Sequence, residues 1–458
     1  MIGEPQPAVR GAAEGEPSRW IERARSAPRH AVGVIGLGYV GLTLAVALAK
    51  KGLTVHGVDT SPAVLEALGQ GRAHLFEPGV EGGLRAFLGE RIHVAPALPA
   101  GGVDAAVICV STPVAPDTHA PQIDNLRLAA RHVAERSGPD TLVIVRSTVP
   151  VGATRSVVLP ELVACWGRAR LAFAPERTIQ GQALRELEEL PQVVGGVDAE
   201  SREAASALFS RLARRVVPVA TLETAELVKL VNNSHTDLIY SFGNEVALLA
   251  QRWGLDPLEV IHAANVEYPR PDLARPGFVG GGCLSKDPYI LISAARGAGY
   301  TPWLVGQARA LNERLPLEVA ERLIALIRET RGSTEGARLC VLGWAYKGWP
   351  PTDDMRGAPI ASMLPLLRAA GLSLRGHDFL VAADTLRGLG AEPVTPEAGF
   401  AGADAVLVTS NHPEYATLDL TRLLATLRRP AVLYDAWRVL DEDAVRSAGV
   451  RYAGIGYG

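Results

Sequence analysis

From Ala31 onward, short apolar segments alternate with stretches of helical periodicity, and this alternation limits the folds open to the chain. AVGVIG, LTVHGVD, RIHVA, DAAVICV and TLVIVRS have the character of strands, separated by helical patterns such as 39–51 and 123–136. The strands are apolar throughout, which is typical of parallel sheets covered by helices on both faces. LAFAP, PQVVGG and VVPVA extend the pattern to about Ala220. The sequence therefore predicts a doubly wound α/β unit over residues 31–220.

The character of the chain changes after residue 220. Residues 221–253 contain no proline and only one glycine, Gly243, and apolar residues recur there at helical spacing, which predicts one long helix. Residues 221–330 form a helical middle unit, interrupted by a Pro- and Gly-rich loop over 268–288. A second strand-rich unit begins at ARLCVLGWAY and covers residues 331–458. The predicted architecture is thus two doubly wound parallel-sheet units joined by a helical central unit.

The composition excludes several classes of partner. The 458 residues carry 46 basic and 49 acidic side chains, a net charge of −3, so the chain has no overall positive field for nucleic acid or an anionic membrane. Residues 1–30 are rich in arginine and lack an apolar core, and we expect a mobile leader there instead of a signal peptide.

An uncharged segment over 31–49 has the length of a membrane span. Four glycines interrupt its first eleven residues, which predicts a strand, a tight turn and a helix instead: Gly33, Gly36, Gly38 and Gly41. We therefore expect no membrane segment.

The four cysteines are widely spaced, so no CxxC pair indicates a zinc site or a redox dithiol, and a reducing cytoplasm fits best. Cys109 and Cys340 lie within apolar strands and are expected to be buried, and Cys165 is expected to pack on a helix. Only five lysines occur among the basic residues, so a site that retains lysine is a candidate for a compact or titrating ammonium.

The motif GLGYVG follows the first predicted strand and opens the first helix. Its glycines allow a tight turn and bring backbone N–H groups close to a pyrophosphate, and Asp59 at the end of the next strand can accept hydrogen bonds from ribose hydroxyls. A carboxylate there repels a 2′-phosphate, which favours NAD over NADP. This Rossmann fingerprint predicts an NAD site formed by Gly36, Gly38, Tyr39, Val40, Gly41 and Asp59.

Two further strand ends carry hydroxyl side chains, Ser111 and Thr112 in VSTP and Ser147 and Thr148 in STVP. Open parallel sheets bind ligands at the carboxyl ends of their strands, so we assign these residues to the cofactor site. Capping of the following helix remains the structural alternative for each segment.

A further group of candidate site residues consists of Glu176 and Arg177, at the strand end APER, and Lys229 and Asn233, in the long helix. Lys229 and Asn233 are four residues apart and share a helix face with small or polar neighbours. The face can line a cleft, and a solvated face would have the same pattern.

Three glycines precede Cys283 in GFVGGGCLSKDP, and Lys286 and Asp287 follow it. We expect Asp287 to cap a helix that starts at Pro288. A nearby cation and a helix N-terminus both lower the pKa of a thiol, so Cys283 is a candidate nucleophile.

From about Val32 to about Leu440 the chain resembles nucleotide-sugar 6-dehydrogenases, the family of UDP-glucose dehydrogenase and UDP-N-acetylmannosamine dehydrogenase. The motifs that carry the resemblance occur in order: GLGYVG, STPV, STVPVG, APERTIQGQALRELEELPQVVGG, AELVKLVNN, GGGCLSKDPY and AYKGWPPTDDMRG. The resemblance implies two Rossmann-like domains and a four-electron oxidation of a UDP-sugar at C6, with two NAD⁺ reduced.

The resemblance also implies roles for individual residues. Cys283 would hold the half-oxidised sugar as a thiohemiacetal and then a thioester, and Lys229 would stabilise oxyanions. Asn233 would fix the sugar, Asp287 would handle protons, and Thr148 and Glu176 would activate water. Family members place further residues on the substrate or cofactor, and by analogy these are Arg177, Phe278, Gly280 and Lys347 on the UDP-sugar and Arg356 near NAD.

Arg270 matches an arginine that family members can contribute from a neighbouring subunit, so the resemblance implies a homodimer. Phe278 and Gly282 depart from the glycine-loop forms frequent among relatives, GWPP lengthens the connection before Arg356, and DAWR replaces a DxRN-like pattern, so no role is assigned to Arg438.

The PERTIQG segment resembles enzymes of N-acetylated UDP-sugars, which favours UDP-N-acetylmannosamine over UDP-glucose and UDP-N-acetylglucosamine. A β-hydroxyacid dehydrogenase and a non-catalytic NAD sensor are the alternatives outside this activity.

Overall fold

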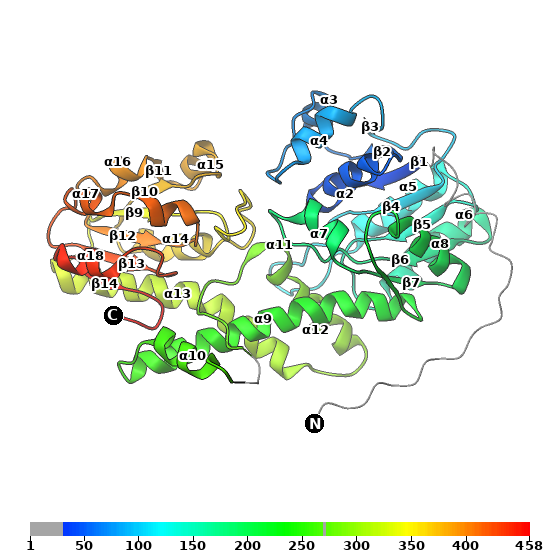
Figure 1. Cartoon of the computed structure of the whole chain (residues 1–458). Helices are drawn as coiled ribbons and strands as arrows, with labels where there is room; N and C mark the ends of the chain where they lie inside the picture. Colours follow the sequence, from blue (N-terminus) through cyan, green and yellow to red (C-terminus); the bar gives the residue numbers. More distant parts are fainter. Residues whose placement is uncertain (1–30, 269–271) are drawn as a thin grey trace.

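The computed structural model describes residues 31–268 and 272–458, which form two α/β units joined by a helical middle unit (Figure 1). The leader expected over 1–30 and the candidate residue Arg270 lie outside the described residues.

The first unit contains an eight-stranded sheet with helices on both faces. Its elements are β1 (Ala31–Ile35), α2 (Tyr39–Lys50), β2 (Thr54–Val58), α3 (Pro62–Gly69), α4 (Val80–Phe87), β3 (Ile92–Ala95), β4 (Ala105–Ile108), α5 (Asp124–Arg136), β5 (Leu142–Val145), η1 (Thr154–Val158), α6 (Leu159–Trp166), β6 (Arg170–Phe173), α7 (Ala183–Glu189), β7 (Gln192–Gly196), α8 (Ala199–Phe209) and β8 (Val216–Pro218).

The strand order of this sheet is β3-β2-β1-β4-β5-β6-β7-β8. All its neighbours are parallel except β6 and β7, which pair antiparallel at Phe173 and Gly195. The sequence predicted a parallel sheet and missed this reversal, because a strand that is buried on both faces has the same apolar pattern in either direction.

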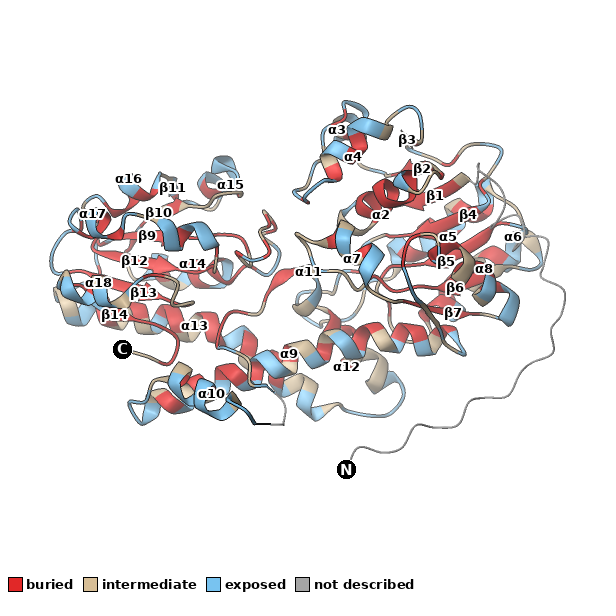
Figure 2. Ribbon diagram, in the orientation of Figure 1, coloured by how far each residue is buried: buried red, intermediate tan, exposed pale blue. Residues whose placement is uncertain are grey.

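Burial on both faces explains why the strands are apolar throughout. Along β4, Ala105 and Val107 join the core that packs under α2 and α8, whereas Ala106 and Ile108 join the core under α5 and α6. Alternate residues of a strand point to opposite faces, so both sets must be apolar when helices cover both faces (Figure 2).

The uncharged segment 31–49 forms β1, a turn and most of α2, as its glycines predicted. Within the described ranges, no helix combines the length and the apolar character that crossing a bilayer requires.

The predicted long helix is α9 (Leu222–Arg252), which begins where the Thr221 hydroxyl accepts a hydrogen bond from the Thr224 N–H at 3.1 Å. It packs against α12 and α13 and runs beneath both sheets (Figure 1). The other helices of the middle unit are α10 (Pro257–Asn265), α11 (Gly281–Leu284), α12 (Asp287–Gly297) and α13 (Trp303–Arg331).

The third unit is built on a six-stranded parallel sheet of order β11-β10-β9-β12-β13-β14, the same relative order as the first six strands of the first unit. Its elements are β9 (Arg338–Leu342), α14 (Pro359–Ala369), β10 (Ser373–His377), α15 (Ala383–Gly388), β11 (Glu392–Pro393), α16 (Pro396–Phe400), β12 (Ala405–Val408), η2 (Pro413–Thr417), α17 (Leu420–Leu424), β13 (Val432–Asp435), α18 (Glu442–Ser447) and β14 (Arg451–Ala453).

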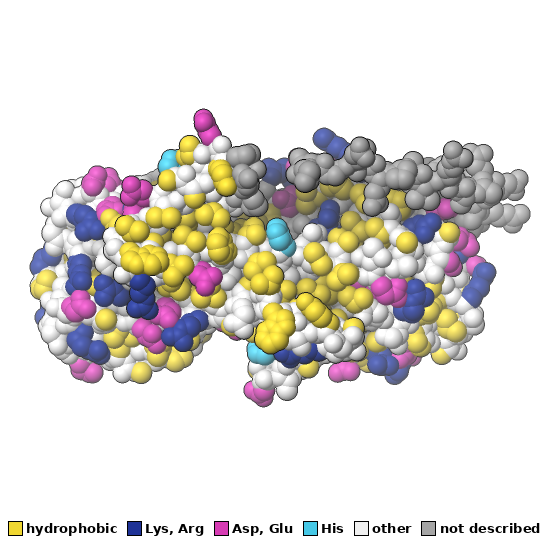
Figure 3. All heavy atoms as spheres, turned by 90° about the horizontal axis from the view of Figure 1, so that it is seen from below, with side chains coloured by type: hydrophobic (Ala, Val, Ile, Leu, Met, Phe, Trp, Pro, Cys, Tyr) yellow, Lys and Arg dark blue, Asp and Glu magenta, His cyan; other side chains and the backbone are white. Residues whose placement is uncertain are grey.

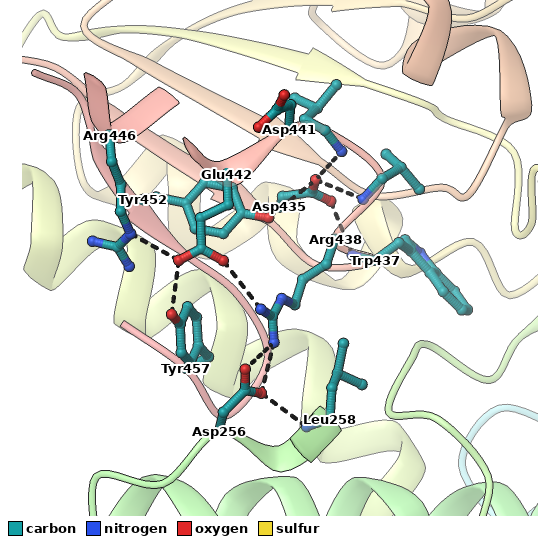
Figure 4. A network of polar contacts seen from close by, with 12 residues as sticks. Asp256, Leu258, Asp435, Trp437, Arg438, Asp441, Glu442, Arg446, Tyr452 and Tyr457 are labelled. Carbon is teal, nitrogen blue, oxygen red and sulfur yellow. Dashed lines mark hydrogen bonds and ion pairs between the residues drawn. The ribbon is translucent and has the colours of Figure 1, made fainter. Parts of the chain in front are cut away.

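Arg438, to which the sequence assigned no role, ties the third unit to the middle unit (Figure 4). Its guanidinium donates to both carboxylate oxygens of Asp256 at 2.6 and 2.8 Å, and Asp256 also caps α10. The same guanidinium pairs with Glu442 at 3.1 Å and lies over the ring of Tyr457.

Candidate active site

The glycines of GLGYVG have separate structural roles between β1 and α2. Gly36 has a φ of +90°, which favours glycine. A Cβ at Gly41 would lie 1.8 Å from the carbonyl oxygen of Gly36, so only glycine lets the helix approach the turn this closely. A Cβ at Gly38 would meet nothing within 4 Å, so space remains beside this turn. The turn therefore has both the shape and the room that a pyrophosphate needs.

Asp59 lies at the end of β2 and faces this turn. Its carboxylate accepts hydrogen bonds from the N–H groups of Leu37 at 2.8 Å and Ser61 at 2.9 Å. The two bonds fix the carboxylate at the position where Rossmann units bind a ribose. Val40 and Tyr39 open α2 beside it.

The hydroxyl residues of the two strand ends lie close together, because β4 and β5 are neighbours and Ile108 pairs with Val145. Thr112 has a buried hydroxyl oxygen without a hydrogen-bond partner in the described structure, so a bound ligand can satisfy it. Ser147 donates to the carbonyl of Val110 at 2.7 Å and thereby holds the two strand ends together.

Ser111 is exposed, and its hydroxyl accepts a hydrogen bond from the Asn125 amide at 3.2 Å; Thr148 is half-buried. The space at Gly38, the unpartnered Thr112 oxygen and the fixed carboxylate of Asp59 fit a dinucleotide such as NAD.

Glu176, at the end of β6, is buried with a fixed carboxylate. Arg146 donates to Oε2 from Nε at 3.0 Å and from Nη2 at 2.6 Å, and the N–H groups of Arg177 and Thr178 donate to Oε1 at 2.7 and 2.8 Å. Burial opposes ionisation, but the Arg146 charge, these hydrogen bonds and the Lys229 charge together lower the pKa of Glu176 below its ordinary value. Glu176 is therefore a carboxylate at neutral pH.

The side chain of Arg177 points away from this carboxylate. It donates to the carbonyl of Pro191 at 2.8 Å and to the side chain of Asn232 at 3.4 Å. These bonds fasten the loop after β6 to the residue before β7 and to α9.

Lys229 is buried on α9 near Glu176, and within residues 31–268 and 272–458 its ammonium makes no hydrogen bond or ion pair. The face it shares with Ala225, Glu226, Asp237 and Ser241 is buried, so the solvated alternative is wrong. An ammonium without such a protein partner can stabilise negative charge that develops on a ligand.

Asn233, one turn after Lys229, donates from Nδ2 to Asp287 Oδ2 at 2.5 Å. Asp287 is fully buried, and its other oxygen accepts from the Lys286 ammonium at 2.6 Å. The predicted capping role of Asp287 is wrong: α12 begins at Asp287 itself and no side chain caps it. The stronger charged and amide donors take both carboxylate oxygens instead.

Cys283 is exposed, in the short helical turn α11. Gly281 has a φ of +88°, and a Cβ at Gly280 would lie 2.1 Å from the Gly357 carbonyl. A Cβ at Gly282 would lie 2.6 Å from the guanidinium carbon of Arg356. The glycines therefore bring the cysteine loop directly against the third unit.

Arg356 links this loop to the turn between β1 and α2, called here the cofactor turn. Its guanidinium pairs with Asp354 at 2.7 Å and lies over the ring of Tyr39, with 5.5 Å between the guanidinium carbon and the ring centroid. The Tyr39 hydroxyl donates to Asp353 at 2.6 Å. Burial and this carboxylate raise the pKa of Tyr39 above its ordinary value, so the hydroxyl keeps its proton.

Lys347 crosses from the third unit to the first, where its ammonium donates to the carbonyl of Gln180 at 2.7 Å. Burial lowers its pKa to about 8, although Glu77, Glu186 and other negative groups act in the opposite direction. Lys347 thus places a cation of the third unit against the loop after β6, and Arg356 places another beside Gly282 of the cysteine loop.

Some of the remaining sequence predictions agree with the structure and others do not. Phe278 is buried in the core of the third unit, edge-on to Trp437, so its side chain contributes packing. Cys109 and Cys340 are buried as predicted, and burial raises the pKa of each thiol to about 12. Cys165 was expected to pack on a helix, but it is exposed because the side of α6 that carries it faces outward.

Sequence reasoning missed two parts of this site. Arg146 was passed over inside the apolar strand end VIVRS, where a single buried charge is itself a signal of a polar partner. Asp353 and Asp354 sit in the quoted motif TDDMRG, but nothing in the sequence alone reveals that they face Tyr39 and Arg356.

Three domain profiles of the UDP-glucose/GDP-mannose dehydrogenase family match the chain in order. The NAD binding domain matches residues 30–213, the central domain residues 223–314 and the UDP binding domain residues 340–442.

Two similar proteins are dehydrogenases of N-acetylated nucleotide sugars, in agreement with the family matches. UDP-N-acetyl-D-mannosamine dehydrogenase of Pyrococcus horikoshii is 32% identical over 436 residues, which cover 93% of this chain and 99% of that protein. NDP-N-acetyl-D-galactosaminuronic acid dehydrogenase of Ralstonia nicotianae is 30% identical over 419 residues, which cover 88% and 96%.

Solved structures extend the likeness to the fold. UDP-D-ManNAc dehydrogenase from Pyrococcus horikoshii has a TM-score of 0.84 at 31% identity, with 93% of this chain and 99% of that chain covered. UDP-glucose dehydrogenase from Pyrobaculum islandicum has a TM-score of 0.83 at 29% identity, with 95% and 99% covered. The matches span all three units that meet around Cys283, and the chain therefore belongs to the UDP-glucose/GDP-mannose dehydrogenase family and is an NAD-dependent UDP-sugar dehydrogenase.

Proposed function

We propose that the protein oxidises the C6 hydroxyl of UDP-N-acetyl-D-mannosamine to a carboxylate through a covalent intermediate on Cys283. The observation that carries this proposal is the exposed thiol of Cys283, presented by a glycine loop between the cofactor turn and the third unit. Bound NAD⁺ supplies a hydride acceptor in each of two successive oxidations. The protein residues supply charge, positioning and the nucleophile.

In the first oxidation the C6 hydroxyl loses a proton as its carbon loses hydride. The Lys229 ammonium stabilises the developing alkoxide, because the residue lies at the buried side of the site and its ammonium has no hydrogen bond or ion pair among the described residues. Glu176 and Thr148 hold the water that takes the proton, and Asn233 binds a sugar hydroxyl. The product of this step is an aldehyde.

In the second oxidation the Cys283 thiolate adds to the aldehyde carbon and forms a thiohemiacetal, which can again give up hydride. The resulting thioester is attacked by water, the C–S bond breaks, and the thiolate leaves. Asp287 accepts a proton during this hydrolysis. In sum, one alcohol, one water and two NAD⁺ give one carboxylate, two NADH and three protons.

The choice of sugar rests on the segment from Pro175 to Gly196, whose PERTIQG start resembles enzymes of N-acetylated UDP-sugars, and on the names of the relatives. UDP-glucose and UDP-N-acetylglucosamine are the alternative substrates. A panel of UDP-sugars scored by NADH release identifies the substrate. Faster turnover of UDP-glucose than of UDP-N-acetylmannosamine would refute the assignment.

The stoichiometry tests the reaction class. We expect two NADH per UDP-sugar consumed, whereas a β-hydroxyacid dehydrogenase releases one and a sensor none. Cys283→Ser should bind NAD normally but lose acid formation by roughly a thousandfold or more, because the covalent route disappears. Cys165→Ser removes the other exposed thiol and is the matched control, with wild-type activity expected. Full activity of Cys283→Ser would contradict the mechanism.

We also propose that the enzyme is a homodimer and that Arg270 reaches the neighbouring subunit's diphosphate site. Hydrophobic side chains gather on the underside, where α9, α10 and α12 lie (Figure 3). Large exposed residues of α9 fit a contact with a second copy: Leu227, Val231, Ile239, Phe242, Leu249. Light scattering should give a dimer mass, and Phe242→Glu should shift it to a monomer; a monomeric wild type would refute this proposal.

A further inference from the structure

A row of buried polar side chains on α9 and α13 lies under the loop that carries Cys283. Its members are Asp237 and Asn244 from α9 and Arg309 and Asn312 from α13, all at most 2% exposed. Burying such groups is costly unless they form hydrogen bonds with one another or with backbone. Their partners therefore indicate what the row is built to hold.

Arg309 holds both ends of the cysteine turn. Its Nη1 donates to the carbonyl of Leu284 at 2.9 Å, and its Nη2 donates to the carbonyl of Val279 at 3.3 Å. These two carbonyls bracket the run from Gly280 to Cys283. A planar guanidinium can bridge two acceptors in a fixed geometry, which a lysine cannot do.

The rest of the row holds Arg309 and the start of the loop. Asp237 accepts from Arg309 at 2.6 Å and from Asn312 at 2.9 Å. Asn312 accepts from Asn244 at 3.0 Å, and Asn244 accepts from the N–H of Gly277 at 2.8 Å. The row thus fixes the backbone at Gly277, Val279 and Leu284, whereas the glycines between them give the chain little stiffness of its own.

We propose that Arg309, held by Asp237, is a positioning residue that presents the Cys283 sulfur to the substrate. It touches neither sulfur nor substrate and acts through the backbone of the loop. The kinetic part of this inference rests on the proposed function, because it requires Cys283 to be the nucleophile. The structural part, that Arg309 orders the loop, does not.

The experiment uses the charge-balanced double variant Asp237→Asn/Arg309→Gln, which leaves no unpaired buried charge. Arg314→Gln on the same helix is the matched control, because Arg314 is exposed and pairs with Glu318. If the double variant does not fold, Arg309→Lys tests the same role, because it keeps the charge but lacks the planar guanidinium that bridges the two carbonyls.

Two readouts on substrate-free protein test the ordering of the loop. Amide hydrogen exchange of residues 277–286 should accelerate by about tenfold to a hundredfold, the effect of losing charge-assisted hydrogen bonds. Iodoacetamide labelling of Cys283 relative to Cys165, the second exposed thiol, should change by a similar factor. The control should match the wild type in both. Unchanged exchange in this loop would overturn the proposal.

The kinetic readout separates positioning from general damage. We expect kcat to fall about tenfold or more while the KM values for NAD and UDP-sugar stay within about threefold, because binding is retained and only the reactive geometry is lost. An unchanged kcat, or a rise in KM alone, would also overturn the proposal. If Cys283→Ser is fully active, the proposed function fails, and the exchange and labelling data still decide the role of Arg309.

Discussion

At the scale of single residues, the buried carboxylate of Glu176 is paired with a buried charge that holds it in place. Glu176 is ionised because Arg146, whose side chain is inaccessible to solvent, donates to it twice. Neither residue stands alone, since removing one leaves the other as an uncompensated buried charge. The stability of the fold therefore depends on the ionised state of Glu176 in the candidate site.

Glu176→Gln should destabilise the protein by about 3–5 kcal/mol at pH 7, because it leaves the buried Arg146 charge without a counter-charge. The folded-state pKa of Glu176 is lowered, so its stabilisation is complete above its unfolded value of 4.5 and is lost as the pH falls through the folded value. The stability gap between wild type and variant should thus shrink in acid. Urea denaturation at several pH values measures it.

The control for this prediction is Glu223→Gln, which breaks the exposed pair with Arg155. Such surface pairs contribute at most about 1 kcal/mol. Equal losses in the two variants would show that the Glu176 pair has no special role.

At the scale of elements, the alternation of strands and helices was predictable because each element carries its own periodicity. The helix expected over 221–253 is α9 (Leu222–Arg252), and the turn glycines lie where GLGYVG placed them. The direction of β7 was not predictable, because direction depends on how the chain returns to the sheet. The capping error at Asp287 has a similar origin, since its partners Asn233 and Lys286 became visible only after folding.

The candidate site was predictable to a different degree. The glycine loop and the residues of α9 were predicted from motifs, because the proposed chemistry limits which residue types can occupy those positions. Arg146 was overlooked although a charge at an apolar strand end is a local signal, whereas Arg309 and Asp353 were not predicted because their partners lie far away in the chain. Pairing across such distances leaves no local pattern in a single sequence.

The turn between β1 and α2 gives a test at this scale. Gly41→Ala should destabilise the first unit by about 1–3 kcal/mol, because the new Cβ would collide with the Gly36 carbonyl. Gly38→Ala should leave stability unchanged but weaken NAD binding, since its Cβ would occupy the space left for the pyrophosphate. Thermal unfolding and NAD titration distinguish the two. Normal NAD affinity in Gly38→Ala would show that the cofactor lies elsewhere.

At the scale of the whole molecule, the first and third units touch across the site. Lys347 binds Gln180, Tyr39 binds Asp353, and Gly181 leaves room for Pro350 of the lengthened GWPP connection. The connection that the sequence flagged as unusual is therefore part of the contact between the two units. Groups from both units therefore border the candidate site.

Lys347 makes this contact sensitive to pH. Because burial lowers its pKa from 10.5 to about 8, the buried charge costs stability at neutral pH, and this cost declines as the pH rises from about 8 towards the unfolded value of 10.5. Lys347→Met should therefore raise the unfolding free energy at pH 7, and the gain should shrink above pH 8. Denaturation across this range measures the effect.

Loss of the Lys347 charge, which should stabilise the fold, should weaken substrate binding. The KM for UDP-sugar should rise above pH 8 in the wild type, as the ammonium loses its proton, and should be high at every pH in Lys347→Met. Lys50→Met, at the exposed end of α2, is the matched control and should behave as the wild type. A KM independent of pH up to 10 would show that Lys347 does not bind the substrate.

One continuous helix, α9, carries Lys229 and Asn233 and also the Asp237 and Asn244 side chains that fasten the cysteine loop. From Lys229 to Asn244 it spans roughly 22 Å as a rigid rod. Because one rigid helix carries the ammonium and anchors the loop that bears the sulfur, the distance between these two groups does not depend on how far the two α/β units stand apart. Any opening of the space between the units would leave that distance unchanged.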